Sequence, residues 1–267
     1  MLKDITIGQF FPADSVIHRL DPRFKIVMTL LFIIMLFTGQ SVVSLVFGIA
    51  YTLTAILLSK IKLRMFAKSI KPLMPFLLVT ALLNILFVSD GTVYFHWKFL
   101  KITSEGINVS VVMIIRIIVL IAGSSLLTYT TSPITLTDAV ERLLSPLKKF
   151  KFPVHELAMM MSIALRFIPT LIEETDKIIS AQKARGAEID TGSIKDRAKN
   201  LVSILVPLFI SAFRRADELA TAMECRCYCG GEGRTRLRQL KSALRDYIAV
   251  AVTIGFFACD IVLNIIY

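Results

Sequence analysis

Apolar residues gather along the chain into five long runs with almost no charge. The runs cover residues 26–38, 41–59, 72–89, 107–128 and 247–267. A helix needs about 20 apolar residues to cross a hydrocarbon core roughly 30 Å thick, so the short first run needs flanking residues to complete it. Only a helix satisfies its backbone polar groups within one such segment. The pattern therefore predicts an all-α integral membrane protein with about five transmembrane helices.

The segment between the last two runs has a different pattern. Within it, apolar stretches at 157–172 and 201–213 each lead into a charged stretch. This change is typical of a helix that is apolar on nearly all sides at first and amphipathic afterwards. We therefore expect an arm of long amphipathic helices that starts against the membrane domain and ends in water. The predicted parts are a membrane domain (1–130), this arm (131–245) and a C-terminal transmembrane helix (246–267).

The composition and the placement of charge agree with a membrane protein. Of the 267 residues, 55% are apolar and 19% are charged, whereas an ordinary soluble domain is about 45–50% apolar. Residues 60–71 carry five Lys and Arg and no acidic residue, and cytoplasmic loops are rich in such cations. This loop, the N-terminus and the arm are therefore predicted to be cytoplasmic, and the C-terminus external.

The net charge of +11 raises the alternative of nucleic-acid binding. However, the basic cluster nearest the last apolar run directly precedes a transmembrane helix, where cations commonly meet anionic lipid head groups. We therefore predict contact with the lipid bilayer and no nucleic-acid partner. The cluster consists of Arg234, Arg236, Arg238, Lys241 and Arg245.

A short sequence repeat closes the two amphipathic stretches of the arm. Its copies are DKIISAQKARG at 176–186 and DELATAMECRC at 217–227. Both copies place an arginine near the end of a helix, where the helix dipole favours a cation. A solvated helix end is one interpretation of such arginines, and the presence of two copies counts against it. Because arginine pairs bidentately with a carboxylate, insertion into a partner's groove is the alternative. The similar pairs are Asp176 and Asp217, Ser180 and Thr221, Ala181 and Ala222, and Arg185 and Arg226.

Several motifs resemble one known family over nearly the whole chain. They are DSVIHRLDPRFKI near the N-terminus, TYTTSPITLTDAVERLL and LRFIPTLIEETDKIISAQKARGAEI in the middle, and LVPLFISAFRRADELATAMECRCYCGGEGRT near the end. They resemble the transmembrane T component of energy-coupling factor (ECF) ABC-type importers, the EcfT/CbiQ-like family. In that family the T component is a membrane scaffold, and two cytoplasmic coupling helices end in Ala-Arg-Gly motifs.

The resemblance implies a set of docking residues and partners. Each motif arginine would dock into a groove on one of two ATPase subunits, either two different proteins or a homodimer. A separate S component in the prokaryotic plasma membrane would bind the substrate, a micronutrient and most simply a vitamin. The first motif is unchanged, whereas cysteines replace alanine and glycine in the second. The docking residues would be Ala184, Arg185, Gly186, Cys225, Arg226 and Cys227.

The resemblance further implies a subunit without catalytic activity or a cofactor of its own, since ATP would be bound by the partners. The chain has no phosphate loop, because GGEGRT at 230–235 lacks the required spacing and lysine. Two alternatives are an integral membrane enzyme acting on lipid phosphates and a secondary transporter. The enzyme would need clustered His, Asp and Glu, and the transporter usually has paired halves with broken spans.

Two charges lie within the apolar runs. Arg116 is in the fourth run and Asp260 is in the last. Because a charge in a bilayer costs about 2.5 kcal/mol or more, we expect each to make an intramembrane polar contact, and they could be counter-charges. A direct role of Arg116 in holding the S component is the alternative.

The sequence gives only a weak signal for a metal site or a functional thiol. His18, His96 and His155 lie far apart in the sequence. Cys225, Cys227 and Cys229 lack the spacing of a zinc site, and a disulfide is not expected in the cytosol. The resemblance instead makes the cysteines small substitutes around Arg226, although an exposed thiol beside an arginine can be reactive. Because Cys227 lacks the freedom of glycine at positive φ, we expect the second helix to continue to Gly230 or Gly231.

Overall fold

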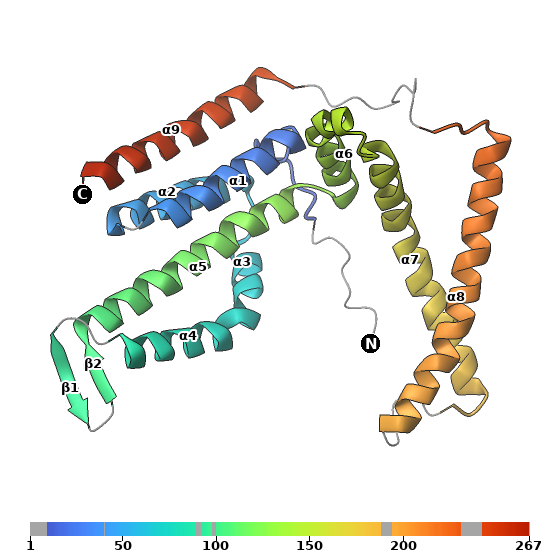
Figure 1. Ribbon diagram of the computed structural model, residues 1–267, viewed down its shortest axis with the longest axis horizontal. Helices are drawn as coiled ribbons and strands as arrows, with labels where there is room; N and C mark the ends of the chain where they lie inside the picture. Colours follow the sequence, from blue (N-terminus) through green and yellow to red (C-terminus); the bar gives the residue numbers. More distant parts are fainter. Residues whose placement is uncertain are drawn as a thin grey trace. The chain divides into compact units, whose positions relative to one another are not determined.

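The computed structural model describes residues 10–39, 41–88, 92–97, 100–187, 194–230 and 242–266. The chain divides into two compact units (Figure 1). The membrane unit contains Gly8–Leu136 and Gln239–Tyr267, and the helical arm is formed by Thr137–Arg238. The predicted all-α membrane fold is confirmed, with one addition that the apolar pattern did not indicate. Strands β1 (Val93–Trp97) and β2 (Leu100–Thr103) form an antiparallel hairpin between α4 and α5.

The helices of the membrane unit follow the predicted apolar runs. Together α3, the 3-10 turn η2 and α4 form one apolar segment, Leu63–Phe87, that is long enough to span a bilayer. Helix α1 has only 17 residues, or about 26 Å, and packs against α2, α5 and α9. The elements are α1 (Pro22–Thr38), α2 (Val42–Ser59), α3 (Leu63–Ile70), η2 (Lys71–Leu73), α4 (Met74–Phe87), α5 (Ser104–Thr130) and α9 (Leu244–Ile266).

Among the described residues, five helical segments are long and apolar enough to cross a membrane, but they are not the predicted five. Helix α1 is too short by that measure, whereas α7 of the helical arm satisfies it. The other four segments coincide with predicted spans. The four segments of the membrane unit make the chain a multi-pass membrane protein.

Local capping explains where the main helices begin. The Asp21 carboxylate accepts a hydrogen bond from Arg23 N and precedes Pro22, which is suited to the first position of α1. Ser41 caps α2 through Ser44 N, and Thr103 caps α5 through Gly106 N. Each cap is a residue whose side-chain oxygen satisfies a backbone N–H that the helix leaves free.

The interior of the membrane unit lies where α1, α2 and α5 meet. Phe32, Met35, Leu36 and Val119 form one buried apolar cluster. A Cβ on Gly123 would lie 2.2 Å from the Phe32 ring, so glycine permits the close approach of α5 to α1. A second buried cluster consists of Ile56, Ile61, Phe66, Ala122 and Tyr129.

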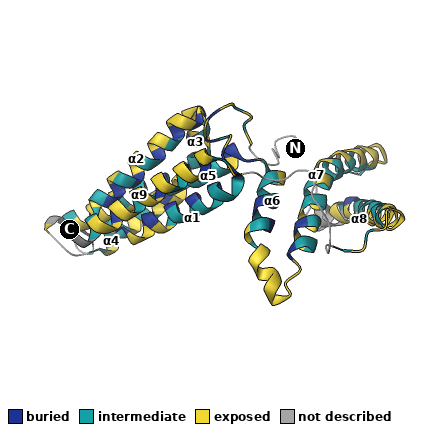
Figure 2. Cartoon of the chain, turned by 90° about the horizontal axis from the view of Figure 1, so that it is seen from above, coloured by how far each residue is buried: buried dark blue, intermediate teal, exposed yellow. Residues whose placement is uncertain are grey.

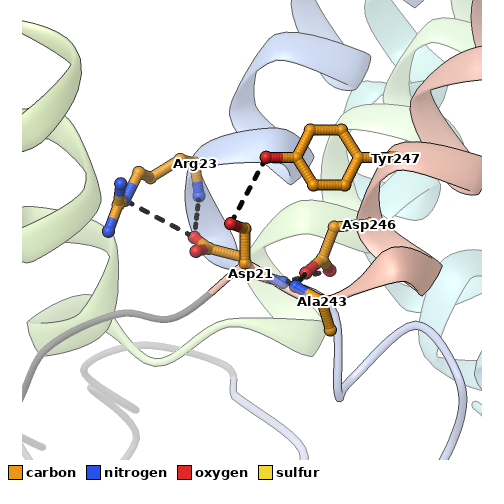
Figure 3. A network of polar contacts seen from close by, with 6 residues as sticks. Asp21, Arg23, Ala243, Asp246 and Tyr247 are labelled. Atoms are coloured by element: carbon orange, nitrogen blue, oxygen red, sulfur yellow. Dashed lines mark hydrogen bonds and ion pairs between the residues drawn. The ribbon is translucent and has the colours of Figure 1, made fainter.

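A buried carboxylate joins the first turns of α1 and α9 (Figure 3). Asp246 Oδ1 accepts from Asp21 N at 2.9 Å, and Asp246 Oδ2 accepts from Ala243 N at 2.7 Å. Nearby, Lys25 Nζ donates to the carbonyl oxygen of Thr130 at 3.0 Å. The starts of α1 and α9 and the end of α5 therefore lie together at one end of the membrane unit.

The helical arm is dominated by two long antiparallel helices, α7 (Val154–Ala184) and α8 (Ile194–Cys225). The two helices run in opposite directions in Figure 1. Gln182 near the end of α7 donates to the carbonyl of Ser203 early in α8, and Glu174 pairs with Arg215 further along. Helix α6 (Pro133–Leu143) and the 3-10 turn η3 (Ser145–Phe150) precede them. Both long helices carry little buried surface in Figure 2.

Candidate functional site

The ends of α7 and α8 have the same backbone hydrogen bonds. At the first end, Gly186 N donates to Lys183 O at 3.0 Å and Ala187 N donates to Gln182 O at 3.0 Å. At the second end, the equivalent donors and acceptors of the repeat do the same: Cys227 N bonds Glu224 O at 2.8 Å, and Tyr228 N bonds Met223 O at 3.0 Å. This paired pattern is a Schellman ending, which satisfies free carbonyls at a helix C-terminus.

Cys227 takes the left-handed conformation that glycine takes in the first copy. Its φ is 54°, and φ of Gly186 is 84°. The prediction that α8 continues to Gly230 or Gly231 is wrong, because α8 ends at Cys225. The hydrogen bonds of the Schellman ending hold Cys227 at positive φ despite its Cβ, a conformation that costs a non-glycine residue about 1–2 kcal/mol.

The repeat extends back into the helices. Ser180 Oγ donates to Asp176 O at 2.8 Å, and Thr221 Oγ1 donates to Asp217 O at 2.9 Å. These are the same pairs that the sequence aligned. The sequence repeat is thus also a repeat of local structure, since side-chain bonds and helix endings recur at one spacing.

The residues of both predicted docking motifs are exposed. Neither Arg185 nor Arg226 forms an ion pair with another residue in the described part of the chain. Arg215, by contrast, is held by the Glu174 carboxylate at 2.9 Å. The two guanidinium groups can therefore meet an external carboxylate. The exposed motif residues are Ala184, Arg185, Gly186, Cys225, Arg226 and Cys227.

The antiparallel packing of α7 and α8 separates the two arginines. Arg185 lies just beyond Gln182, which contacts Ser203 near the start of α8. Arg226 follows the far end of α8, and the helical rise of about 1.5 Å per residue puts it roughly 35 Å from Ser203. The structure does not bring the two motifs into one site. The two motifs therefore form two separate sites.

Glu174, Ser211 and Arg215 fix the crossing of α7 and α8, and the sequence interpretation missed them. A hydrogen bond from Ser211, followed by the charge of Arg215, lowers the pKa of Glu174 from its ordinary value. Glu174 and Arg215 are separated by the same spacing as the aligned pairs of the repeat. The signal available in the sequence was therefore an opposite pair of charges at equivalent positions of the repeat.

The apolar surface of the helical arm is largely uncovered. Phe209 and Phe213 expose 63% and 61% of their surface, and Met160 and Met161 expose 54% and 51%. Large exposed apolar patches mark sites of contact with proteins or membranes. The arm therefore has an apolar interaction surface besides the two arginine ends.

The two intramembrane charges meet at the same corner of the membrane unit. Arg116 Nη2 donates to Gly39 O at 2.6 Å, and Asp260 Oδ2 would lie 3.4 Å from a Cβ on Gly39. Asp260 is 1% exposed. Neither its oxygens nor Arg116 Nε has a hydrogen-bond partner among the described residues, and no direct ion pair joins the two side chains. Both charges reach the junction of α1 and α2 from different helices.

The remaining candidates are dispersed. His18 Nε2 donates to Phe11 O, and its Nδ1 shares a hydrogen bond with Ser15 Oγ. His155 Nδ1 lies 3.1 Å from Glu141 Oε1. The His96 side chain lies outside the described residues, as do residues 231–235 of GGEGRT and most of the basic cluster before α9. Over the described ranges, no group of three or more His, Cys, Asp and Glu could hold a metal ion. Cys229 is exposed.

Comparison with known proteins gives one consistent result. A family model described as CbiQ, cobalt transport protein, matches residues 13–237. This match includes both helix endings and most of the membrane unit.

Curated relatives match over nearly their whole length. An energy-coupling factor transporter transmembrane protein EcfT of Clostridium kluyveri is 55% identical over 93% of each chain. Proteins of the same name from Ruminiclostridium cellulolyticum and Streptococcus equi are 49% and 43% identical, over 100% and 95% of each chain. The chain therefore belongs to the CbiQ family, and these relatives are transmembrane proteins of energy-coupling factor transporters.

Proposed function

We propose that this chain is the membrane-embedded energy-coupling scaffold of an ECF-type, ATP-driven importer. Separate ATPase subunits change conformation, α7 and α8 transmit the movement, and a substrate-binding S component in the membrane responds. The chain itself carries out no catalysis and holds no cofactor, because ATP is bound by the partner subunits. The names of the relatives and the family support this assignment.

The observation that carries the proposal is the pair of equivalent, exposed arginines. Arg185 and Arg226 follow matching helix ends, lack ion-pair partners among the described residues, and lie far apart on an antiparallel pair. A single contact with one partner subunit would need only one such helix end. Two ATPase subunits, different or identical, would each take one arginine, with the small flanking residues allowing the helix end to approach closely.

The proposed topology places the helical arm and the N-terminus in the cytoplasm and the C-terminus outside a prokaryotic plasma membrane. Although α7 is long enough to span a bilayer, only its first half is apolar, and Arg166 lies within that half. A charge there would cost about 2.5 kcal/mol or more in lipid. The apolar half is better suited to lie against the S component or the membrane surface, where Phe209 and Phe213 of α8 are also exposed.

We propose a micronutrient, and most simply a vitamin, as the cargo. The S component would select it, and one scaffold could serve several S components. The family description mentions cobalt, whereas the relatives are named for energy coupling. No nucleic-acid partner is proposed.

Affinity purification of the tagged chain in mild detergent tests the assignment. The expected result is co-purification of one or two ATPases with phosphate loops and a small membrane protein. A chain that purifies alone and turns over a lipid phosphate, or that transports a solute on its own in vesicles, would contradict it in favour of an enzyme or a secondary transporter.

A further inference from the structure

An apolar groove of about 350 Å³ lies between α1, α2, α5 and α9 of the membrane unit. Residues of α9 that line the groove extend from Arg245 to Phe256, a length of about three helical turns. Several apolar residues of the lining are more than half exposed, namely Leu58, Ile248 and Val252. Its volume lies in the usual range of about 300–1,000 Å³ for small-molecule sites. The groove is thus long, apolar and open to the outside of the membrane unit.

Both cations of the lining lie at one end of the groove. Lys25 is in the first turn of α1 and Arg245 is in the first turn of α9. Lys25 Nζ reaches the carbonyl of Thr130, the last residue of α5. No acidic side chain is among the described residues that line the groove. The groove therefore has a cationic mouth and an apolar body.

The two cations differ in what they can bind. Lys25 is buried, and its ammonium already donates to His18 O, Thr130 O and Thr131 Oγ1 at 3.0–3.4 Å. Arg245 is exposed and forms no ion pair within the described part of the chain. The carboxylate of Asp246 next to it accepts from two backbone N–H groups. Arg245 is therefore available to an external anion.

We propose that this groove binds an anionic phospholipid. One acyl chain lies along the apolar lining, and the phosphate meets the Arg245 guanidinium at the mouth. The charge distribution fits this ligand, because a phospholipid has one anionic end and an apolar remainder. A transmembrane helix of a partner protein would leave Arg245 facing an apolar surface. Lipid binding in this groove is independent of the proposed function.

Photo-crosslinking of the full chain in nanodiscs tests the site. The probes are phosphatidylglycerol and phosphatidylcholine that carry the same photoreactive acyl chain. Phosphatidylglycerol is expected to label groove residues such as Met28 and Ala249 about fivefold more than phosphatidylcholine, the effect of one basic residue near an anionic lipid. Arg245→Gln should remove this preference. Arg64→Gln, which changes an exposed basic residue of α3 outside the lining, should keep it.

A variant that fills the groove separates binding in the groove from general attraction to the surface. Ala249→Phe should abolish labelling of Met28 by both lipids, while an unchanged thermal midpoint in detergent shows that the chain is folded. If Ala249→Phe unfolds, Ala55→Leu from the facing helix α2 serves the same purpose. Equal labelling by both lipids, or a preference that survives Arg245→Gln, would overturn the proposal. So would labelling that disappears once partner subunits are bound, since a protein would then occupy the groove.

Discussion

Gly186 and Cys227 occupy equivalent positions of the repeat, and both have positive φ, 84° and 54°. Each donates a backbone hydrogen bond that closes the end of a long helix, from Gly186 N to Lys183 O and from Cys227 N to Glu224 O. The Schellman ending is therefore preserved although the residue is not. Each ending presents an exposed surface around one arginine.

Replacement of Cys227 by glycine should stabilise the helical arm. The left-handed conformation strains a residue with a Cβ, so Cys227→Gly is expected to raise the free energy of unfolding by about 0.5–1 kcal/mol. The reciprocal change Gly186→Cys, where no atom lies within 4 Å of the added Cβ, should lower it by a similar amount through φ alone. Thermal unfolding in detergent measures both. Shifts of the same sign in the two variants would contradict the equivalence of the two ends.

The Glu174–Arg215 pair should make the packing of α7 and α8 sensitive to acid. Because the folded pKa of Glu174 is lowered from its ordinary value of 4.5, its contribution is present above pH 4.5 and is lost as the pH falls through the folded pKa. Glu174→Gln should therefore flatten the dependence of arm stability on pH below 4.5. Glu173→Gln is the neighbouring control. If both variants follow the wild-type pH curve, Glu174 does not contribute in this way.

Arg116 and Asp260 should be energetically coupled. Each lies at the Gly39 corner, and although no direct ion pair joins them, the attraction between two nearby opposite charges offsets part of the cost, about 2.5 kcal/mol or more, that each has in lipid. Arg116→Met and Asp260→Leu are each expected to destabilise the membrane unit by about 2–3 kcal/mol. The double variant should cost less than their sum.

A matched cycle gives the control for this coupling. Asn264 donates to Thr38 O at 3.4 Å near the same corner but is uncharged. Asn264→Leu should be additive with Arg116→Met. Additivity of the Arg116 and Asp260 changes as well would show that the two charges act independently.

Asp246 should hold the starts of α1 and α9 together. Asp246→Ala leaves two N–H groups without their acceptor, the buried one of Asp21 and the part-buried one of Ala243, at an expected cost of about 2–4 kcal/mol. Asp246→Asn keeps one acceptor oxygen and should cost about half as much. Arg245→Gln, one residue earlier, should leave the thermal midpoint unchanged. An alanine variant as stable as the wild type would show that the contact is dispensable.

The sequence pattern predicted four of the five candidate spans in the described residues, because a helix suited to lipid leaves a long uncharged run. It did not predict the pairing of β1 and β2, since two strands of five and four residues carry a weak signal. The sequence pattern also did not predict that α8 ends at Cys225. Residue preference favoured a longer helix, but hydrogen bonds from the turn outweighed the strain of positive φ at Cys227.

The candidate site was partly predictable. The repeat placed Arg185 and Arg226 at helix ends because local chemistry repeats with the sequence. The distance between them was not predictable, since it depends on the antiparallel contact of Gln182 with Ser203. Likewise, the sequence identified Arg116 and Asp260 as costly charges, but only the fold brings both to Gly39.

Docking of two ATPase subunits by Arg185 and Arg226 is the central claim. The most direct measurement is the amount of ATPase that co-purifies with Arg185→Ala plus Arg226→Ala, relative to the wild type, after membrane insertion has been verified. We predict loss of both ATPases in the double variant and retention of one in each single variant. The control, Lys177→Ala plus Arg214→Ala, removes two exposed cations of the same helices and should retain both ATPases. A double arginine variant that still carries both ATPases and supports full uptake would contradict the claim.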